Sequence, residues 1–186
     1  MTDKKKKEIF NIPNLITLLR FILIPVFIQL YAMKDEKGRL LAAAVFAVAA
    51  CSDWLDGFLA RKFNQITPLG EALDPLADKL MQTVAVLCLY FQDTIKLWIV
   101  ALFIIKEILM ISISSILFSK EKHCIPSRWY GKISTAFFFF IVFVTIAFKD
   151  IPPVVIDAGF SVAVILAVYS FIRYSLVYLD HKKYNR

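Results

Sequence analysis

Six long apolar segments, separated by short polar stretches, dominate the pattern along this chain of 186 residues. Most of them approach or exceed the roughly 20 residues that an α-helix needs to cross a bilayer. Pro13 suits the first turn of a helix, and Pro152-Pro153 marks a break before the last segment. The pattern therefore predicts an all-α integral membrane bundle of six transmembrane helices. The expected spans cover residues 13–32, 40–62, 73–91, 94–118, 133–148 and 153–179.

Composition supports this class, because 59% of the residues are hydrophobic and the charges are strongly segregated. The sequence has no visible internal repeat, so we expect a single domain over residues 1–186. The basic run Lys4 to Lys7 lies within residues 1–12, which we interpret as a juxtamembrane segment. Such a segment is attracted to the headgroups of anionic membrane lipids. A solvated tail is the alternative for the same residues.

The distribution of Lys and Arg predicts the orientation of the spans. One set of loops and tails is rich in them: Lys4 to Lys7, Arg61, Lys62, Lys120, Lys122, Arg128, Lys132, Lys182, Lys183 and Arg186. The other set has fewer: Lys34, Lys37, Arg39, Lys96 and Lys149. Both termini are therefore expected on the cytoplasmic side of a bacterial-type cytoplasmic membrane. The net charge of +7 follows this topology, and without a soluble basic domain we expect no nucleic-acid partner.

Four carboxylates interrupt the second and third apolar segments at helical spacings: Asp53, Asp56, Asp74 and Asp78. At about 100° per residue, Asp53 and Asp56 share one helix face with Gly57 and Ala60. Gly70, Asp74 and Asp78 share an arc of the next helix. Asp53 precedes the basic residue Arg61 by about 12 Å of helix, which places the acids just below the cytoplasmic interface.

Carboxylates at this depth need neutralisation, because each costs on the order of 2.5–3.5 kcal/mol on insertion scales. Protonation, basic neighbours such as Arg61 and Lys79, or metal ions could provide it, and a salt-bridge network that serves only packing is the structural alternative. The small residues Gly57, Ala60 and Gly70 leave room beside the acids, as a ligand would require. Two Mg²⁺ ions holding phosphate oxygens would fit this donor set. Asp78 could instead take the proton of an attacking hydroxyl.

The spacing of these residues resembles the signature of the CDP-alcohol phosphatidyltransferase superfamily at all of its fixed positions. Those positions are Asp53, Asp56, Gly57, Ala60, Arg61, Gly70, Asp74 and Asp78. The segment from Asn11 to Arg20 is similar to the bacterial phosphatidylglycerophosphate synthase branch. The resemblance implies a homodimeric enzyme that transfers a phosphatidyl group from CDP-diacylglycerol to an alcohol and releases CMP.

The resemblance also implies roles for the individual residues. Asp53, Asp56, Asp74 and Asp78 would bind two metal ions, usually Mg²⁺ or Mn²⁺, and Asp78 would also be the general base. The CDP-lipid would be held by Asn14, Thr17, Arg20, Asp56, Gly57, Ala60, Arg61 and Gly70. The branch implies glycerol 3-phosphate as the acceptor, whose phosphate needs a basic partner. Candidates for that partner are Lys106, Arg128 and Lys132, of which Lys106 is the most informative because it lies within a span.

Three alternatives remain at this point. Lys106 could be a charge partner for a carboxylate on a neighbouring helix. In the synthase branch that the chain resembles, this helix typically carries Arg-Glu followed by a further Arg, whereas this chain has Lys106-Glu107 and no cation until Lys120. Phosphatidylglycerol is therefore an alternative acceptor, as in cardiolipin synthases, and inositol phosphate and serine are further ones. A cation transporter with an acidic site is the third, although transporters commonly show repeated halves and this chain does not.

Overall fold

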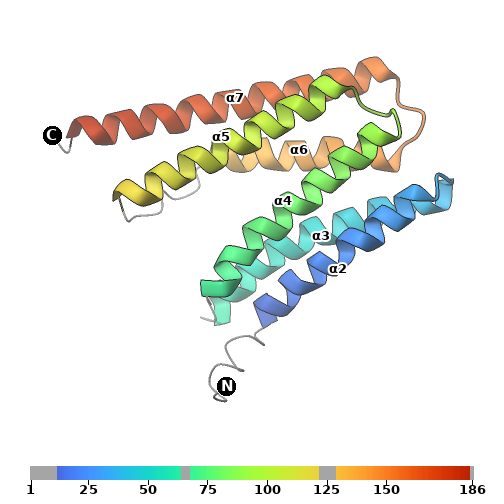
Figure 1. The fold of residues 1–186 in the computed structure, drawn as a ribbon, viewed down its shortest axis with the longest axis horizontal. Helices are drawn as coiled ribbons and strands as arrows, with labels where there is room; N and C mark the ends of the chain where they lie inside the picture. Colours follow the sequence, from blue (N-terminus) through green and yellow to red (C-terminus); the bar gives the residue numbers. More distant parts are fainter. Residues whose placement is uncertain (1–11, 64–67, 122–128, 185–186) are drawn as a thin grey trace. The chain divides into compact units, whose positions relative to one another are not determined.

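The computed structural model describes the backbone of residues 12–63, 68–121 and 129–184, and the side chains of residues 17–52, 73, 76–110, 129 and 131–173. Within this part of the chain all regular structure is helical, as predicted (Figure 1). The helices are α2 (Ile12–Ala32), α3 (Glu36–Phe63), α4 (Pro68–Phe91), α5 (Leu97–Glu121), α6 (Trp129–Ala147) and α7 (Pro153–Tyr184).

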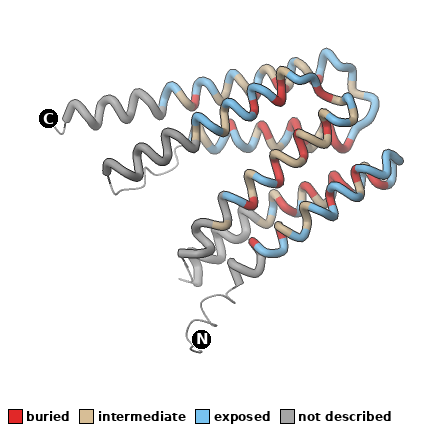
Figure 2. The backbone as a smooth tube through the Cα atoms, in the orientation of Figure 1, coloured by how far each residue is buried: buried red, intermediate tan, exposed pale blue. Residues whose placement is uncertain are grey.

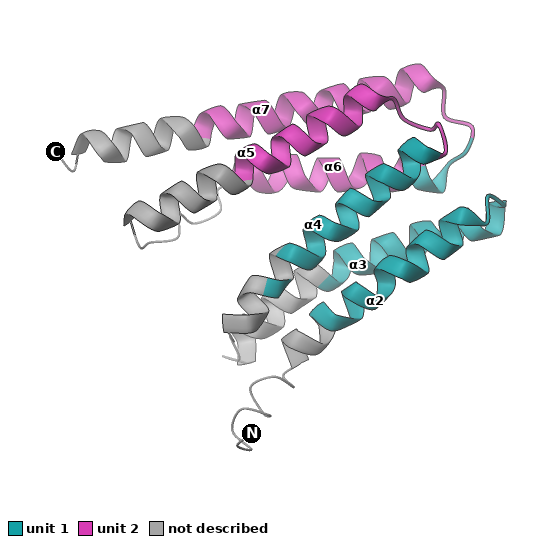
Figure 3. Ribbon diagram, viewed as in Figure 1, with its two compact units in different colours: residues 1–91, 146–149 teal, residues 92–145, 150–186 magenta. Residues whose placement is uncertain are grey.

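The helices form two compact units, which are described separately (Figure 3). The first unit contains residues 1–91 and 146–149, and the second contains residues 92–145 and 150–186. In the first unit, α2 packs against both α3 and α4, and α3 packs against α4. In the second unit, α5 packs against α7. The expectation of one domain over the whole chain stays a prediction.

Local sequence signals explain the sharp turn between α2 and α3. Lys34 has a φ of 59°, a left-handed conformation that reverses the chain after α2. Asp35 then caps α3, because its Oδ1 accepts a hydrogen bond of 2.8 Å from the backbone N–H of Gly38. Gly38 is needed there, since a Cβ at this position would lie 2.6 Å from the carbonyl oxygen of Leu30. The two helices can therefore approach closely at this end.

Helical periodicity explains which residues form the interior of the first unit. On α3, the buried positions include Ala42, Ala43, Phe46 and Ala49, which recur about once per turn. Small residues at such positions let neighbouring helices come close. The ring of Phe46 also lies against Phe27 of α2, with centroids 6.1 Å apart. Buried and exposed positions alternate in this way along the described helices (Figure 2).

Within the part of the chain whose side chains are described, one helical segment, Pro153–Arg173, is both long and apolar enough to cross a membrane. Thr17–Ala32 and Gly131–Ala147 are apolar but shorter. The all-helical prediction is thus confirmed for the described residues, while six spans and the side of each terminus stay predictions. Several helix ends differ from the expected spans: α4 begins at Pro68 rather than at residue 73, and α6 begins at Trp129 rather than at residue 133.

Candidate active site

The predicted metal and nucleotide residues lie on two helices that pack together in the first unit. Asp53, Asp56, Gly57, Ala60 and Arg61 are on α3, and Gly70, Asp74 and Asp78 are on α4. The helical register gives the first four an arc of about 100° and the α4 residues an arc of about 80°. Of the eight, only Asp78 has a described side chain. Convergence of the four carboxylates therefore stays a prediction, supported by helical backbone at every motif position.

Asp78 is the described member of this motif, and it is partly buried on α4. Its Oδ2 accepts a hydrogen bond of 2.8 Å from Nε2 of Gln82, one helical turn further along. Gln82 is only 3% exposed. Gln82 was not among the site residues predicted from the sequence. A polar side chain at i+4 from an acidic residue, inside an otherwise apolar stretch, is the signal that could have found it.

Of the three α2 residues predicted to lie near the CDP-lipid, the structure describes the side chains of Thr17 and Arg20. Thr17 and Arg20 are each 1% exposed, although a fully buried arginine is rare. A guanidinium is expensive to remove from water unless carboxylate or phosphate groups compensate its charge. Its position on α2, which packs against both motif helices, suits such compensation. The side chain of Asn14 lies outside the described residues.

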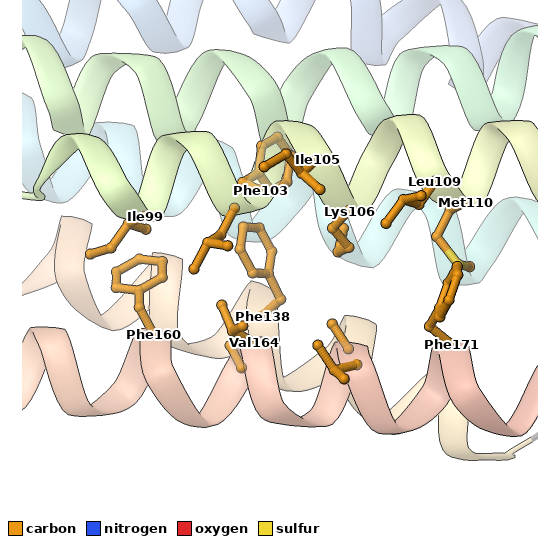
Figure 4. A pocket seen from close by; sticks show the side chains of 14 residues that line it. Ile99, Phe103, Ile105, Lys106, Leu109, Met110, Phe138, Phe160, Val164 and Phe171 are labelled. Atoms are coloured by element: carbon orange, nitrogen blue, oxygen red, sulfur yellow. The ribbon is translucent and has the colours of Figure 1, made fainter.

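Lys106 is partly buried in the second unit, within a cavity of about 130 Å³. Apart from Lys106, the lining is apolar and comes from α5, α6 and α7 (Figure 4). The Lys106 ammonium lies 5.0 Å from the ring centroids of both Phe103 and Phe138. Its Nζ is 2.6 Å from Oε1 of Glu107. Among the residues whose side chains the structure describes, the carboxylate partner of Lys106 is thus its neighbour in sequence, Glu107, rather than a residue of another helix.

The other two acceptor candidates are less defined. Lys132 lies on α6 in the second unit and is exposed. Arg128 lies outside the described residues. The structure groups the donor and metal candidates of α2, α3 and α4 in the first unit, and it places Lys106 and Lys132 in the second. That all of them serve one reaction stays a prediction.

Donor chemistry determines whether this chain could hold the expected metal ions. Asp53 and Asp56 are about one turn apart on α3, and Asp74 and Asp78 are about one turn apart on α4, which packs against α3. One oxygen of Asp78 accepts a hydrogen bond from the amide of Gln82. Hard oxygen ligands of this kind suit Mg²⁺ and Mn²⁺. Hydrogen-bonded ligand carboxylates are also typical of metal sites. The residues present therefore fit divalent ions, although the binding itself stays a prediction.

Comparison with known proteins identifies the family. The family model for CDP-alcohol phosphatidyltransferase matches residues 10–173, which include the whole motif and helices from both units. A protein named CDP-diacylglycerol–glycerol-3-phosphate 3-phosphatidyltransferase from Pseudomonas fluorescens is 54% identical over 89 residues, covering 48% of this chain and 45% of that relative. The Escherichia coli K12 protein of the same name is 38% identical over 130 residues, covering 68% of this chain and 71% of the relative. The match thus spans less than half of the Pseudomonas relative and about seven tenths of the Escherichia one. These matches confirm the resemblance inferred from Asp53 to Asp78: the chain belongs to the CDP-alcohol phosphatidyltransferase family.

Proposed function

We propose that this chain transfers the phosphatidyl group of CDP-diacylglycerol to glycerol 3-phosphate and releases CMP. The observation that carries the proposal is the complete acidic motif on two packed helices, within a family match over residues 10–173. The names of the relatives from Pseudomonas fluorescens and Escherichia coli support this donor and this acceptor.

The reaction would be a direct displacement at phosphorus. The acceptor hydroxyl oxygen forms a bond to the phosphorus that carries diacylglycerol, and the bond from that phosphorus to the oxygen of the CMP phosphate breaks. CMP leaves with the electron pair of the broken bond. The hydroxyl proton passes to the carboxylate of Asp78, which lies on α4. No external oxidant, reductant or further reactant is needed.

Asp53, Asp56 and Asp74, together with Asp78, would hold two divalent metal ions. When bound, Mg²⁺ or Mn²⁺ would neutralise the carboxylates and stabilise negative charge on the phosphate oxygens. The chain's own contribution would be to present these carboxylates from one face each of α3 and α4, as the spacing along the two helices predicts. Gly57, Ala60 and Gly70 lack bulky side chains, which leaves room for the cytidine nucleotide beside the acids.

The basic residues would hold the phosphate groups of the two substrates. Arg20 is buried on α2 beside the motif helices and would pair with the donor phosphates, as would Arg61. Lys106 would bind the phosphate of glycerol 3-phosphate, exchanging its contact with Glu107 for one with the acceptor. Asn14 and Thr17 would contact the donor from α2, and Arg128 and Lys132 would assist at the acceptor.

The six helices would each cross a bacterial-type cytoplasmic membrane, with both termini and the α3–α4 connection on the cytoplasmic side. The apolar segment Pro153–Arg173 and the distribution of Lys and Arg support this topology. The active site would then lie near the cytoplasmic face, where CDP-diacylglycerol headgroups and a water-soluble acceptor can meet. We also propose that the enzyme acts as a homodimer, as the family resemblance implies.

Release of CMP from CDP-diacylglycerol by the purified chain tests this function. Detergent-solubilised protein is incubated with Mg²⁺ or Mn²⁺ and with no acceptor, glycerol 3-phosphate or phosphatidylglycerol. The expected result is release that depends on both metal and glycerol 3-phosphate. Release that depends on phosphatidylglycerol would instead identify a cardiolipin synthase. If neither glycerol 3-phosphate nor phosphatidylglycerol leads to release of CMP, the transferase proposal is overturned.

A further inference from the structure

Gln82 is a buried amide that contacts the carboxylate expected to act as the base. Its Nε2 donates to Oδ2 of Asp78 over 2.8 Å, and only 3% of Gln82 is exposed. The residue interrupts an apolar stretch in which Met81 and Val86 are also buried. Since a buried amide loses its hydrogen bonds to water, its contact with Asp78 replaces part of that lost solvation.

Helix stability alone gives a weak reason for a glutamine at this position. A side-chain pair at i, i+4 stabilises a helix by about 0.2–0.5 kcal/mol. Full burial of a Leu or Met side chain contributes roughly 1.5–3 kcal/mol. An apolar residue in place of Gln82 would therefore satisfy packing better. What it could not provide is an N–H donor directed at Asp78.

We propose that Gln82 is a positioning residue for Asp78, an inference that rests on the proposed function. An ionised carboxylate only accepts hydrogen bonds, so the amide nitrogen is the Gln82 atom that must face it. By holding Oδ2, Gln82 limits rotation of the Asp78 side chain and orients the carboxylate for metal and for the acceptor hydroxyl. Groups that hydrogen-bond a ligand carboxylate in this way tune metal affinity from outside the ligand set.

Thr83 provides a matched control in the next position of the same helix. Its Oγ1 donates to the backbone carbonyl of Lys79 over 2.7 Å, so it also makes an intrahelical bond of i, i−4 type. Thr83 is partly buried, but its hydrogen bond goes to the backbone rather than to Asp78. Thr83→Val removes a comparable hydrogen bond without touching the carboxylate.

The test compares metal binding and metal activation in full-length wild type, Gln82→Met, Gln82→Asn and Thr83→Val. Mn²⁺ binding is measured from the electron paramagnetic resonance signal of free Mn²⁺, and activation from metal-dependent CMP release. Gln82→Met has a similar size but no donor, and Gln82→Asn keeps an amide that is one methylene further from Asp78. Both variants are expected to raise the dissociation constant for Mn²⁺ and the metal concentration needed for half-maximal activation roughly tenfold. The KM for CDP-diacylglycerol should change little. Thr83→Val is expected to match wild type.

A purely structural role for Gln82 would lower the folded fraction without changing the Mn²⁺ constant of the protein that remains folded. Unchanged metal constants in the Gln82 variants would therefore overturn the proposal, and Gln82→Asn decides it if Gln82→Met does not fold. The proposed function fails separately, if wild type releases no CMP with any acceptor. In that case the Mn²⁺ measurement still decides whether Gln82 orients a metal-binding carboxylate.

Discussion

The ring of Phe103 on α5 stacks against the ring of Phe138 on α6, with centroids 5.0 Å apart and an interplanar angle of 16°. This pair makes an aromatic surface under the ammonium group of Lys106, which lies 5.0 Å from each centroid. Cation–π contacts and the neighbouring Glu107 together compensate a charge that a mostly apolar cavity would otherwise disfavour. The arrangement fixes the position of the Lys106 side chain within the second unit.

Lys106→Met is expected to raise the KM for glycerol 3-phosphate about tenfold or more, because a hydrogen bond to a charged group contributes about 1.5–3 kcal/mol. The KM for CDP-diacylglycerol should change little. Methionine retains an apolar stem of similar length to line the cavity, so the loss is confined to the charge. Steady-state CMP release with each substrate varied in turn provides the measurement. Equal increases in both KM values would make Lys106 a structural residue.

Lys96→Met is the matched control for that experiment. Lys96 also belongs to the second unit and also pairs with a carboxylate, that of Asp157, but its side chain is 62% exposed. An exposed pair of this kind contributes little to stability. Lys96→Met is expected to retain the wild-type KM values for both substrates. A raised KM in Lys106→Met is then due to Lys106 itself and not to the loss of a paired lysine in general.

Asp78→Asn is expected to lower kcat by at least about a hundredfold, since asparagine cannot accept the acceptor hydroxyl proton. The amide has the same size as the carboxylate, so the fold should persist, as judged by the thermal unfolding midpoint in detergent. Asp157→Asn removes a partly buried carboxylate of the second unit, outside the acidic motif, and should keep wild-type kcat. Substantial activity in Asp78→Asn would exclude Asp78 as the base.

The six apolar segments predicted the six helices that the structure describes, but the apolar pattern did not predict where several of them begin. Only the apolar part of a helix resembles a span, so the first turns of α4 and α6, which contain the charged residues Glu71 and Lys132, were not included. The start of α3 was also missed, although the cap residue Asp35 directly precedes Glu36. Capping signals are local and could have corrected that boundary.

Some features of the candidate site follow from local sequence, and others depend on tertiary packing. Spacing alone placed the motif residues on the faces of two helices, because the 3.6-residue period needs no knowledge of packing. The surroundings of Lys106 depend on Phe138, which is distant in the sequence and reaches Lys106 only through the packing of α6. The contact between Gln82 and Asp78 is local, yet it depends on the rotamers that burial selects.

Asp35→Ala is expected to lower the free energy of unfolding by about 1 kcal/mol. The substitution removes the oxygen that accepts the backbone N–H of Gly38 in the first turn of α3. Asp35→Asn keeps a side-chain oxygen in the same place and should retain most of the stability. Unfolding of the detergent-solubilised protein, followed by circular dichroism, measures both variants. Equal losses in the two would show that the carboxylate charge, rather than the cap, is responsible.

Gly38→Ala is expected to be more destabilising than Gly159→Ala, and the comparison tests the close approach of α2 and α3. At Gly38 a Cβ would lie 2.6 Å from the carbonyl oxygen of Leu30 and 2.8 Å from Cβ of Met33, neither of which can move without moving the backbone. At Gly159 the clash is with the terminal methyl and Cγ1 of Ile141, which can rotate.

Overpacking against backbone typically costs about 1–3 kcal/mol. Replacing a glycine within a helix by alanine gains up to about 1 kcal/mol of helix propensity, which offsets the milder clash at Gly159. The expected result is a clearly lower unfolding midpoint for Gly38→Ala and a midpoint near wild type for Gly159→Ala. Since neither glycine belongs to the acidic motif, both variants should keep the wild-type Mn²⁺ constant while folded. The reverse order of midpoints would contradict the packing described for the turn between α2 and α3.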